Sequence, residues 1–204
     1  PTPPRRRSRS SLIFRCNTRV LGACAALALS SLLPAGQVAA HWDDAYYHDY
    51  DDLPAQSRWM STLHDSATLD TITMPGTHGS AARHGGWIAE NQTLTISQQL
   101  KAGIRFLDLR PRHYYDTLEM HHGIVYQHQS FPQALDEIVA FLLAHPTETV
   151  LVRVKEEGSA QGNSRTFEQT LESYFAKYGK HFATNANLAT PLRDLRGKIV
   201  MFKH

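Results

Sequence analysis

The chain has 204 residues, of which 42% are hydrophobic and 20% are charged, a composition typical of one globular domain. Its formal charge of +2 depends on the first forty residues, which hold six arginines and no acidic residue. The remainder carries 15 basic against 19 acidic residues, a formal charge of −4, so no nucleic-acid partner is expected.

The N-terminal segment has the pattern of a secretory signal peptide. Basic "PTPPRRRSRSSLIFRCNTR" precedes apolar "VLGACAALALSSLLPAG", and Val38 and Ala40 suit a cleavage site after Ala40. We expect residues 1–40 to be removed and the mature protein to be secreted, extracellular or periplasmic; an uncleaved anchor is the alternative. The apolar run is shorter than the ~20 residues of a membrane span, so no transmembrane segment is expected in the mature chain. Both cysteines, Cys16 and Cys24, lie within residues 1–40 and are expected to be removed with the signal peptide.

Polar and aromatic residues 41–64 are expected to lead into a catalytic domain at 65–204. Strand and helix patterns alternate in that domain. We expect strands at 69–74, 104–112, 149–157 and 197–202, and helices at 94–103, 131–146 and 165–179. Such alternation predicts a parallel α/β fold, and about four or five strands are too few to close an eight-stranded barrel.

Capping signals set the limits of two of these helices. Thr95 with Gln98, and Ser130 with Gln133, each form a capping box at a helix start. Gly103 follows the first helix, where a left-handed residue ends a helix most easily.

Functional side chains in parallel α/β folds lie at the carboxyl ends of strands and in the loops that follow. The residues at such positions are His78, Asp108, Arg110, His121, His122, Lys155 and Glu156. Two imidazoles can remove and donate protons near neutrality, and a guanidinium fits phosphate oxygens. Together with a carboxylate, these groups are suited to phosphodiester cleavage.

Other interpretations of these residues are open. His121, His122 and His128 suggest zinc, but adjacent residues of a strand point to opposite faces, and no carboxylate or cysteine completes a ligand set. We therefore expect no metal and no other cofactor. The remaining residues also fit structural roles, as a solvated loop histidine, an ion pair or a solvated strand end.

The motifs and their order resemble a known family. "MPGTHGS", "QQLKAGIRFLDLRPR", "LEMHHGIVY", "FLLAHPTETVLVRVKEE" and "LRGKIVMFK" are similar to the X region of phosphatidylinositol-specific phospholipases C, most of all its secreted bacterial branch. The resemblance covers residues 65–204. It implies a TIM-like (β/α) barrel and cleavage of phosphatidylinositol to diacylglycerol and inositol 1,2-cyclic phosphate. It also implies peripheral contact with a membrane surface.

The resemblance implies a role for each matching residue. His78 would be the base that deprotonates the inositol 2-hydroxyl, and His122 would be the acid that protonates the departing diacylglycerol oxygen. Arg110 would stabilise the phosphate, in the place where calcium-dependent relatives have an acidic metal ligand. Asp108 would orient its neighbours, and Lys155 would lie near the inositol or the phosphate.

Two departures from the family pattern leave alternatives open. Gly79 stands where the family usually has aspartate or asparagine, and the chain ends at His204, where only the N-terminal half of a barrel is expected. One alternative is a metal-dependent phosphodiesterase of the glycerophosphodiesterase or sphingomyelinase D kind. The other is a non-catalytic truncated remnant or headgroup-binding module.

Overall fold

The computed structural model describes residues 55–203, which form two sheets and the helices around them. The predicted signal peptide, 1–40, lies outside the described residues, as does the first part of segment 41–64. The strands are β1 (Gly76–Thr77), β2 (Phe106–Leu109), β3 (Pro111–Tyr114), β4 (Thr117–His122), β5 (Val125–Ser130), β6 (Val150–Val154) and β7 (Ile199–Lys203). The α-helices are α1 (Ile96–Ala102), α2 (Phe131–Ala144), α3 (Phe167–Tyr178) and α4 (Leu192–Leu195).

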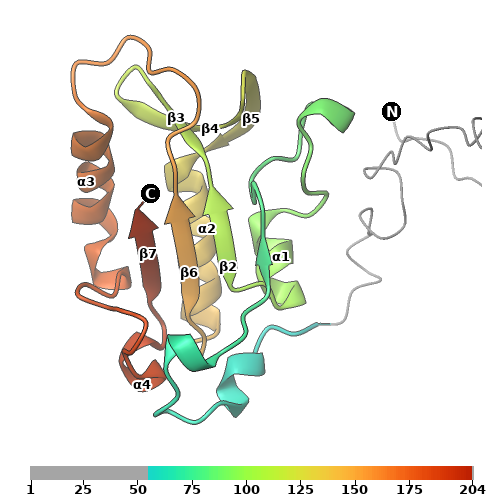
Figure 1. The fold of residues 1–204 in the computed structure, drawn as a ribbon, viewed down its shortest axis with the longest axis vertical. Helices are drawn as coiled ribbons and strands as arrows, with labels where there is room; N and C mark the ends of the chain where they lie inside the picture. Colours follow the sequence, from blue (N-terminus) through green and yellow to red (C-terminus); the bar gives the residue numbers. More distant parts are fainter. Residues whose placement is uncertain (1–54, 204) are drawn as a thin grey trace, which may run out of the picture. The chain divides into compact units, whose positions relative to one another are not determined.

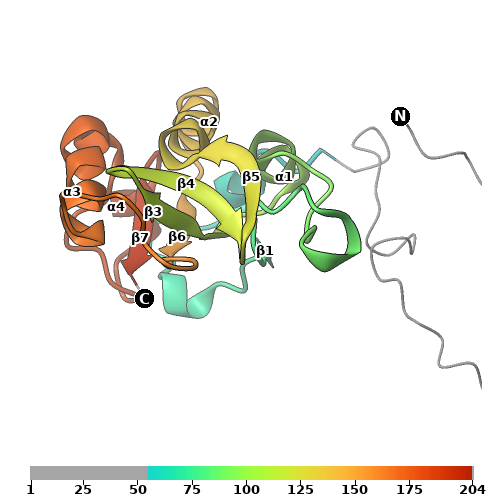
Figure 2. The same cartoon turned by 90° about the horizontal axis from the view of Figure 1, so that it is seen from above.

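A parallel sheet, in the order β1-β2-β6-β7, forms the body of the fold. Helices α1, α2 and α3 lie along one side of it, as the view from above shows (Figure 2). The helix-facing core includes Leu107 and Leu109 of β2 and Val152 of β6, all fully buried. This arrangement confirms the predicted α/β class.

The opposite face of the parallel sheet is called the inner face here. It carries Phe106 and Leu151, with Asp108 and Arg153 one pleat further toward the carboxyl ends of their strands. The pairing of Arg153 with Phe202 continues that row onto β7. Because side chains alternate between the faces of a strand, charged groups of this row point away from the helix-facing core.

The antiparallel sheet β3-β4-β5 lies beyond the carboxyl ends of β2 and β6 (Figure 1). The predicted strand 104–112 is wrong in its limits, because β2 ends at Leu109 and Pro111 begins a new strand that pairs with β4. Arg110 lies at the break, and its carbonyl accepts a hydrogen bond from His121 N at 3.0 Å.

The predicted strand 69–74 is also wrong. Leu69–Thr71 form a 3₁₀ helix, and the first strand is Gly76–Thr77. Hydroxyl side chains of this segment compete with sheet pairing: the Thr68 hydroxyl donates to the Asp70 carboxylate, and the Thr71 hydroxyl donates to the Thr68 carbonyl.

The predicted helix starts are confirmed. The Thr95 hydroxyl accepts from Gln98 N at 3.1 Å, and Gln98 Oε1 accepts from Thr95 N at 2.9 Å. Gln133 Oε1 accepts from Ser130 N at 2.7 Å at the start of α2. Gly103 ends α1 with φ of 112°, in the left-handed region. Local side-chain chemistry therefore defines these helix ends.

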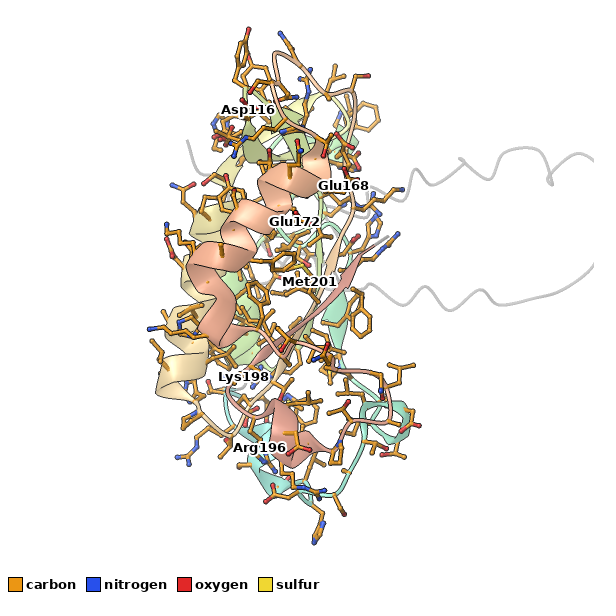
Figure 3. All side chains as sticks on the ribbon, turned by 90° about the vertical axis from the view of Figure 1, so that its left-hand side faces the viewer. Asp116, Glu168, Glu172, Arg196, Lys198 and Met201 are labelled. Carbon is orange, nitrogen blue, oxygen red and sulfur yellow. The ribbon has the colours of Figure 1, made fainter. Side chains whose placement is uncertain are left out.

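Two polar clusters lie at opposite ends of the domain formed by residues 55–203, where Figure 3 labels Arg196 and Asp116. Arg196 donates to Asp65 at 2.7 Å and to the carbonyls of Leu63 and Met60. The carboxylate of Asp116 accepts from Ser164 N at 2.8 Å, and these bonds connect β3-β4 to the segment before α3. No helix within residues 55–203 is long and apolar enough to cross a membrane.

Candidate active site

The loops that follow β1, β2 and β6 lie side by side at the carboxyl end of the parallel sheet. Ser80 N donates to the carbonyl of Asp108 at 2.9 Å, and Lys155 N donates to that of Leu109 at 3.1 Å. Three strand ends are therefore fixed against one another, as expected for a site in a parallel α/β fold.

The carboxylate of Asp108 is the centre of this region. Its side chain is only 4% exposed. Oδ2 accepts from Arg110 Nε at 3.0 Å and from Gly79 N at 3.2 Å, and it lies 3.3 Å from His78 Nδ1. Oδ1 lies 3.6 Å from a guanidinium nitrogen of Arg153. The cations around this buried carboxylate offset the cost of placing its negative charge away from water.

His78 lies at the open side of this cluster. Its side chain is 64% exposed, and Nδ1 points toward Asp108. If Nδ1 carries the ring proton, it can donate a hydrogen bond to that carboxylate. Nε2 then has a free lone pair that can accept a proton or a hydrogen bond from a ligand. Gln92 Nε2 donates to the carbonyl of His78 at 2.8 Å and so restrains the backbone.

The two adjacent histidines of β4 differ as the strand pattern predicts. His122 Nδ1 lies 2.8 Å from the carbonyl oxygen of Ala89, an acceptor that fixes a proton on Nδ1 and leaves Nε2 for proton exchange. His121 is buried, and its Nδ1 has no hydrogen-bond partner within residues 55–203. Burial lowers the pKa of His121, and the charge of Arg112 lowers it further. His121 therefore has the environment of a neutral core residue.

Glu157 and Arg153 contact the candidate site residues, although the sequence motifs did not single them out. Glu157 Oε2 lies 3.9 Å from Arg110, and Oε1 accepts from Gly123 N at 2.8 Å, next to His122. The alternation of "VLVRVKEE" puts both residues on the face of Lys155, which was the available signal.

The structure thus brings three predicted residues, His78, Asp108 and Arg110, into direct contact. His122 is connected to them through the backbone bond between its neighbour and Arg110. Lys155 lies at the same strand end and is half-buried, and its side chain makes no hydrogen bond or ion pair to the other four within the described part of the chain. In that part, no group of three or more His, Cys, Asp or Glu side chains is arranged to hold a metal ion.

Comparison with known proteins connects this arrangement to one family. Residues 77–204 match the model of the phosphatidylinositol-specific phospholipase C, X domain. The chain is 33% identical over 156 residues to the 1-phosphatidylinositol phosphodiesterase of Listeria monocytogenes, covering 71% of this chain and 47% of the relative. The Staphylococcus aureus (strain Newman) protein of the same name is 32% identical over 167 residues, covering 76% of this chain and 53% of the relative.

Solved structures agree with the sequence relatives. A mutant of the phosphatidylinositol-specific phospholipase C from Staphylococcus aureus superposes with a TM-score of 0.69 at 31% identity, over 73% of this chain and 52% of that one. Such neighbours are TIM-barrel proteins, and the parallel sheet described here confirms the predicted partial (β/α) barrel. The chain spans about half the length of the curated relatives it matches.

Proposed function

The chain belongs to the phosphatidylinositol-specific phospholipase C X-domain family, and we propose that it is a phosphodiesterase that cleaves phosphatidylinositol to diacylglycerol and inositol 1,2-cyclic phosphate. One observation carries the proposal: a buried carboxylate, Asp108, contacts an exposed imidazole and two guanidinium groups. An imidazole beside fixed cations suits a reaction in which a hydroxyl loses its proton while negative charge grows on phosphate.

Two histidines supply the proton transfers in this proposal. His78 Nε2 takes the proton of the inositol 2-hydroxyl, whose oxygen then attacks phosphorus. Asp108 stabilises the imidazolium that forms, because its Oδ2 lies 3.3 Å from His78 Nδ1. His122, protonated before the reaction, gives its Nε2 proton to the diacylglycerol oxygen as the phosphorus–oxygen bond breaks. Attack and departure together leave a cyclic diester and an alcohol.

Arg110 supplies the positive charge for the phosphate in the proposed mechanism. Asp108 and Glu157 hold its guanidinium from two directions, at 3.0 and 3.9 Å. A positioned guanidinium keeps its charge throughout the reaction and can replace a metal ion at a phosphate. We therefore propose metal-independent cleavage, with Lys155 near the inositol or the phosphate.

The test is release of diacylglycerol from phosphatidylinositol vesicles in the presence of EDTA. We expect H78A and H122A each to lower the rate by about 100- to 10,000-fold, the usual contribution of a positioned acid or base. H64A is the matched control, because His64 is exposed and its ring, within residues 55–203, bonds only to Ser66. Its rate should equal that of the unchanged chain.

Other results would select another function. Activity that disappears with EDTA and returns with calcium or magnesium would contradict the metal-independent mechanism and favour a metal-dependent phosphodiesterase. Binding of inositol phosphate without any turnover would favour a headgroup-binding module, for which Gly79, in the position of the family's acid, is the motivating residue.

We also propose that the protein docks on membranes through exposed apolar side chains beside His122. Trp87 and Ile88 are 72% and 68% exposed, and Ile124 is 95% exposed. Ala89, which follows the first pair, accepts the hydrogen bond from His122, and Ile124 is two residues from that histidine. Apolar side chains at this edge can enter the lipid interface while the headgroup approaches the site.

Vesicle sedimentation tests this docking surface. W87A and I124S should each weaken binding to phosphatidylinositol-containing vesicles, with a smaller effect on cleavage of a soluble headgroup ester. L188S is the control, because Leu188 is 54% exposed and bonds through its carbonyl to Asp70 N, in the segment before β1. Equal loss in all three variants would contradict the proposed surface.

Export is the last part of the proposal. The basic and apolar pattern of residues 1–40 supports secretion with cleavage near Ala40. N-terminal sequencing of the protein recovered outside the cytoplasm should begin at His41; a sequence that retains the arginines would contradict cleavage there.

A further inference from the structure

Arg153 is a cation of the candidate site whose guanidinium donates no hydrogen bond within residues 55–203. The only polar contact of this side chain there is the 3.6 Å approach to Asp108 Oδ1, too long for a hydrogen bond. Its side chain is 29% exposed, and Asp108 Oδ1 is itself buried without a hydrogen-bond partner. Because a guanidinium has five N–H donors and half-buried donors are normally satisfied, this group has capacity for a ligand.

The register of the sheet shows where the unused N–H donors of Arg153 lie. Arg153 pairs with Asp108 on one side and with Phe202 on the other, so it lies on the inner face. Arg110 and Lys155 each come directly after the last residue of β2 and β6, two residues beyond Asp108 and Arg153. Arg153 therefore lies one pleat deeper than the groups assigned to the phosphate, where the far side of a headgroup would reach.

The charges of the site indicate which chemical group Arg153 would bind. Three permanent cations, Arg110, Arg153 and Lys155, are opposed by two carboxylates, Asp108 and Glu157. With the proton that His122 carries in the proposed mechanism, the sum is two positive charges, and the single negative charge of a phosphodiester leaves one of them. A second phosphate on the headgroup would leave uncompensated negative charge. The spare donors of Arg153 are therefore suited to neutral oxygen acceptors.

We propose that Arg153 is a specificity-determining residue that donates hydrogen bonds to ring hydroxyls of an unphosphorylated polyol headgroup. The inference rests on the proposed function and adds the group by which inositol is distinguished from a smaller headgroup. A ring hydroxyl gains a charge-assisted bond here, whereas a short headgroup ends before it reaches the deeper pleat and leaves the donors unpaired.

Two lipids with the same reacting group test the proposal. Phosphatidylinositol and phosphatidylglycerol both carry a hydroxyl adjacent to the phosphate, but only the first carries a ring. Cleavage of each is measured for the unchanged chain, for R153S and for the control R193S. The side chain of Arg193 is exposed and pairs with the exposed Asp194. We expect R153S to lower the kcat/KM ratio of phosphatidylinositol to phosphatidylglycerol by about 10- to 100-fold, the worth of one or two charge-assisted hydrogen bonds.

Each outcome decides the role of Arg153. An unchanged ratio, or an equal fall on both lipids with unchanged stability in urea, would show that Arg153 only holds Asp108 and would overturn the proposal. A parent chain inactive on both lipids overturns the proposed function itself.

Binding measured by titration calorimetry tests the same proposal without any turnover. The experiment compares myo-inositol 1-phosphate with glycerol 1-phosphate on the unchanged chain and R153S. Preference for the inositol ester that R153S loses supports the role of Arg153, and no preference in the unchanged chain overturns it.

Discussion

The two ends of the parallel sheet each hold an arginine, and the two side chains differ in how many of their donors are used. At the end where the strands begin, called the base, Arg105 is fully buried and each of its nitrogens donates. Nε and one terminal nitrogen bond to Glu148 at 3.1 and 2.8 Å. The other terminal nitrogen bonds to the carbonyls of Leu100 and Ile104, at 2.7 and 2.8 Å.

At the carboxyl end, called the rim, the guanidinium of Arg153 makes no hydrogen bond within the described residues, and His78 points a ring nitrogen away from Asp108. The same residue type thus stabilises the fold at the base and remains available at the rim. Saturated donors identify a structural charge, and unsaturated donors identify a site. Composition alone does not separate the two.

The largest expected effect is at the base. E148Q removes the negative charge that neutralises Arg105, and both side chains are fully buried. We expect the free energy of unfolding, measured in urea, to fall by about 3–5 kcal/mol, because an uncompensated charge is left in the interior. R193M, in an exposed pair, should cost less than about 0.5 kcal/mol. A loss below about 1 kcal/mol for E148Q would mean that the base does not depend on this pair.

The next expected effect is on activity at the rim. D108N keeps the shape of the side chain but removes the charge shared by His78, Arg110 and Arg153. We expect kcat/KM on phosphatidylinositol to fall by about 100- to 10,000-fold, because the imidazolium that forms loses its counterion. The free energy of unfolding should change by only about 1 kcal/mol. If D108N instead lowered stability strongly and kept its activity, Asp108 would be a structural charge like Glu148 and not a residue of the site.

Local chemistry explains which parts of this distinction could be predicted from the sequence. The helix starts at Thr95 and Ser130 and the shared face of Asp108 and Arg110 depend on residues within four positions of each other. The pattern of apolar residues in 131–146 likewise specifies a helix without distant partners.

The strands and site residues that the sequence did not predict depend on partners that are distant in the chain. The 111–130 sheet encloses polar side chains: His113 bonds to Thr170 at 2.9 Å, and Gln127 bonds to His84 N at 2.8 Å. Such residues have no apolar alternation, so their strands are not predicted from hydrophobicity. Arg153 was missed for a related reason, since its partner Asp108 lies on a neighbouring strand 45 residues earlier in the chain.

A smaller effect is expected at Gly79, the rim residue whose N–H donates to Asp108. Its φ is +51°, and an added Cβ would lie 2.4 Å from Asn91 Nδ2. We expect G79A to lower the free energy of unfolding by about 1–3 kcal/mol, from left-handed strain and steric overlap.

A second substitution separates the two causes at Gly79. Asn91 Nδ2 is buried without a hydrogen-bond partner in the described chain, so N91A alone should cost little. In G79N/N91A, asparagine tolerates the left-handed conformation and the overlap is gone, so most of the stability should return. Failure of this pair to recover stability would show that another contact requires glycine here.

The smallest expected effect concerns the pH dependence of stability, and it comes from His121. Burial lowers the pKa of His121 below its ordinary value of 6.5. The unfolded chain therefore binds more protons than the folded chain as the pH falls below about 6.5, and this residue destabilises the fold over that window. H121F removes the titration, so the slope of unfolding free energy against pH should decrease by at most about 1.36 kcal/mol per unit.

His121 also tests whether every polar group at the rim serves the site. Its unpartnered Nδ1 resembles the unsaturated donors of Arg153, but its ring is buried 5.5 Å from that of Tyr126. An aromatic ring should replace it with little loss of activity, whereas R153S changes lipid selectivity. Urea unfolding between pH 5 and 8, with the exposed H64F as control, measures the first effect. If H121F instead abolished cleavage at full stability, a buried group that a ligand does not reach would belong to the site. Exposure to a ligand would then fail as the criterion for a site residue.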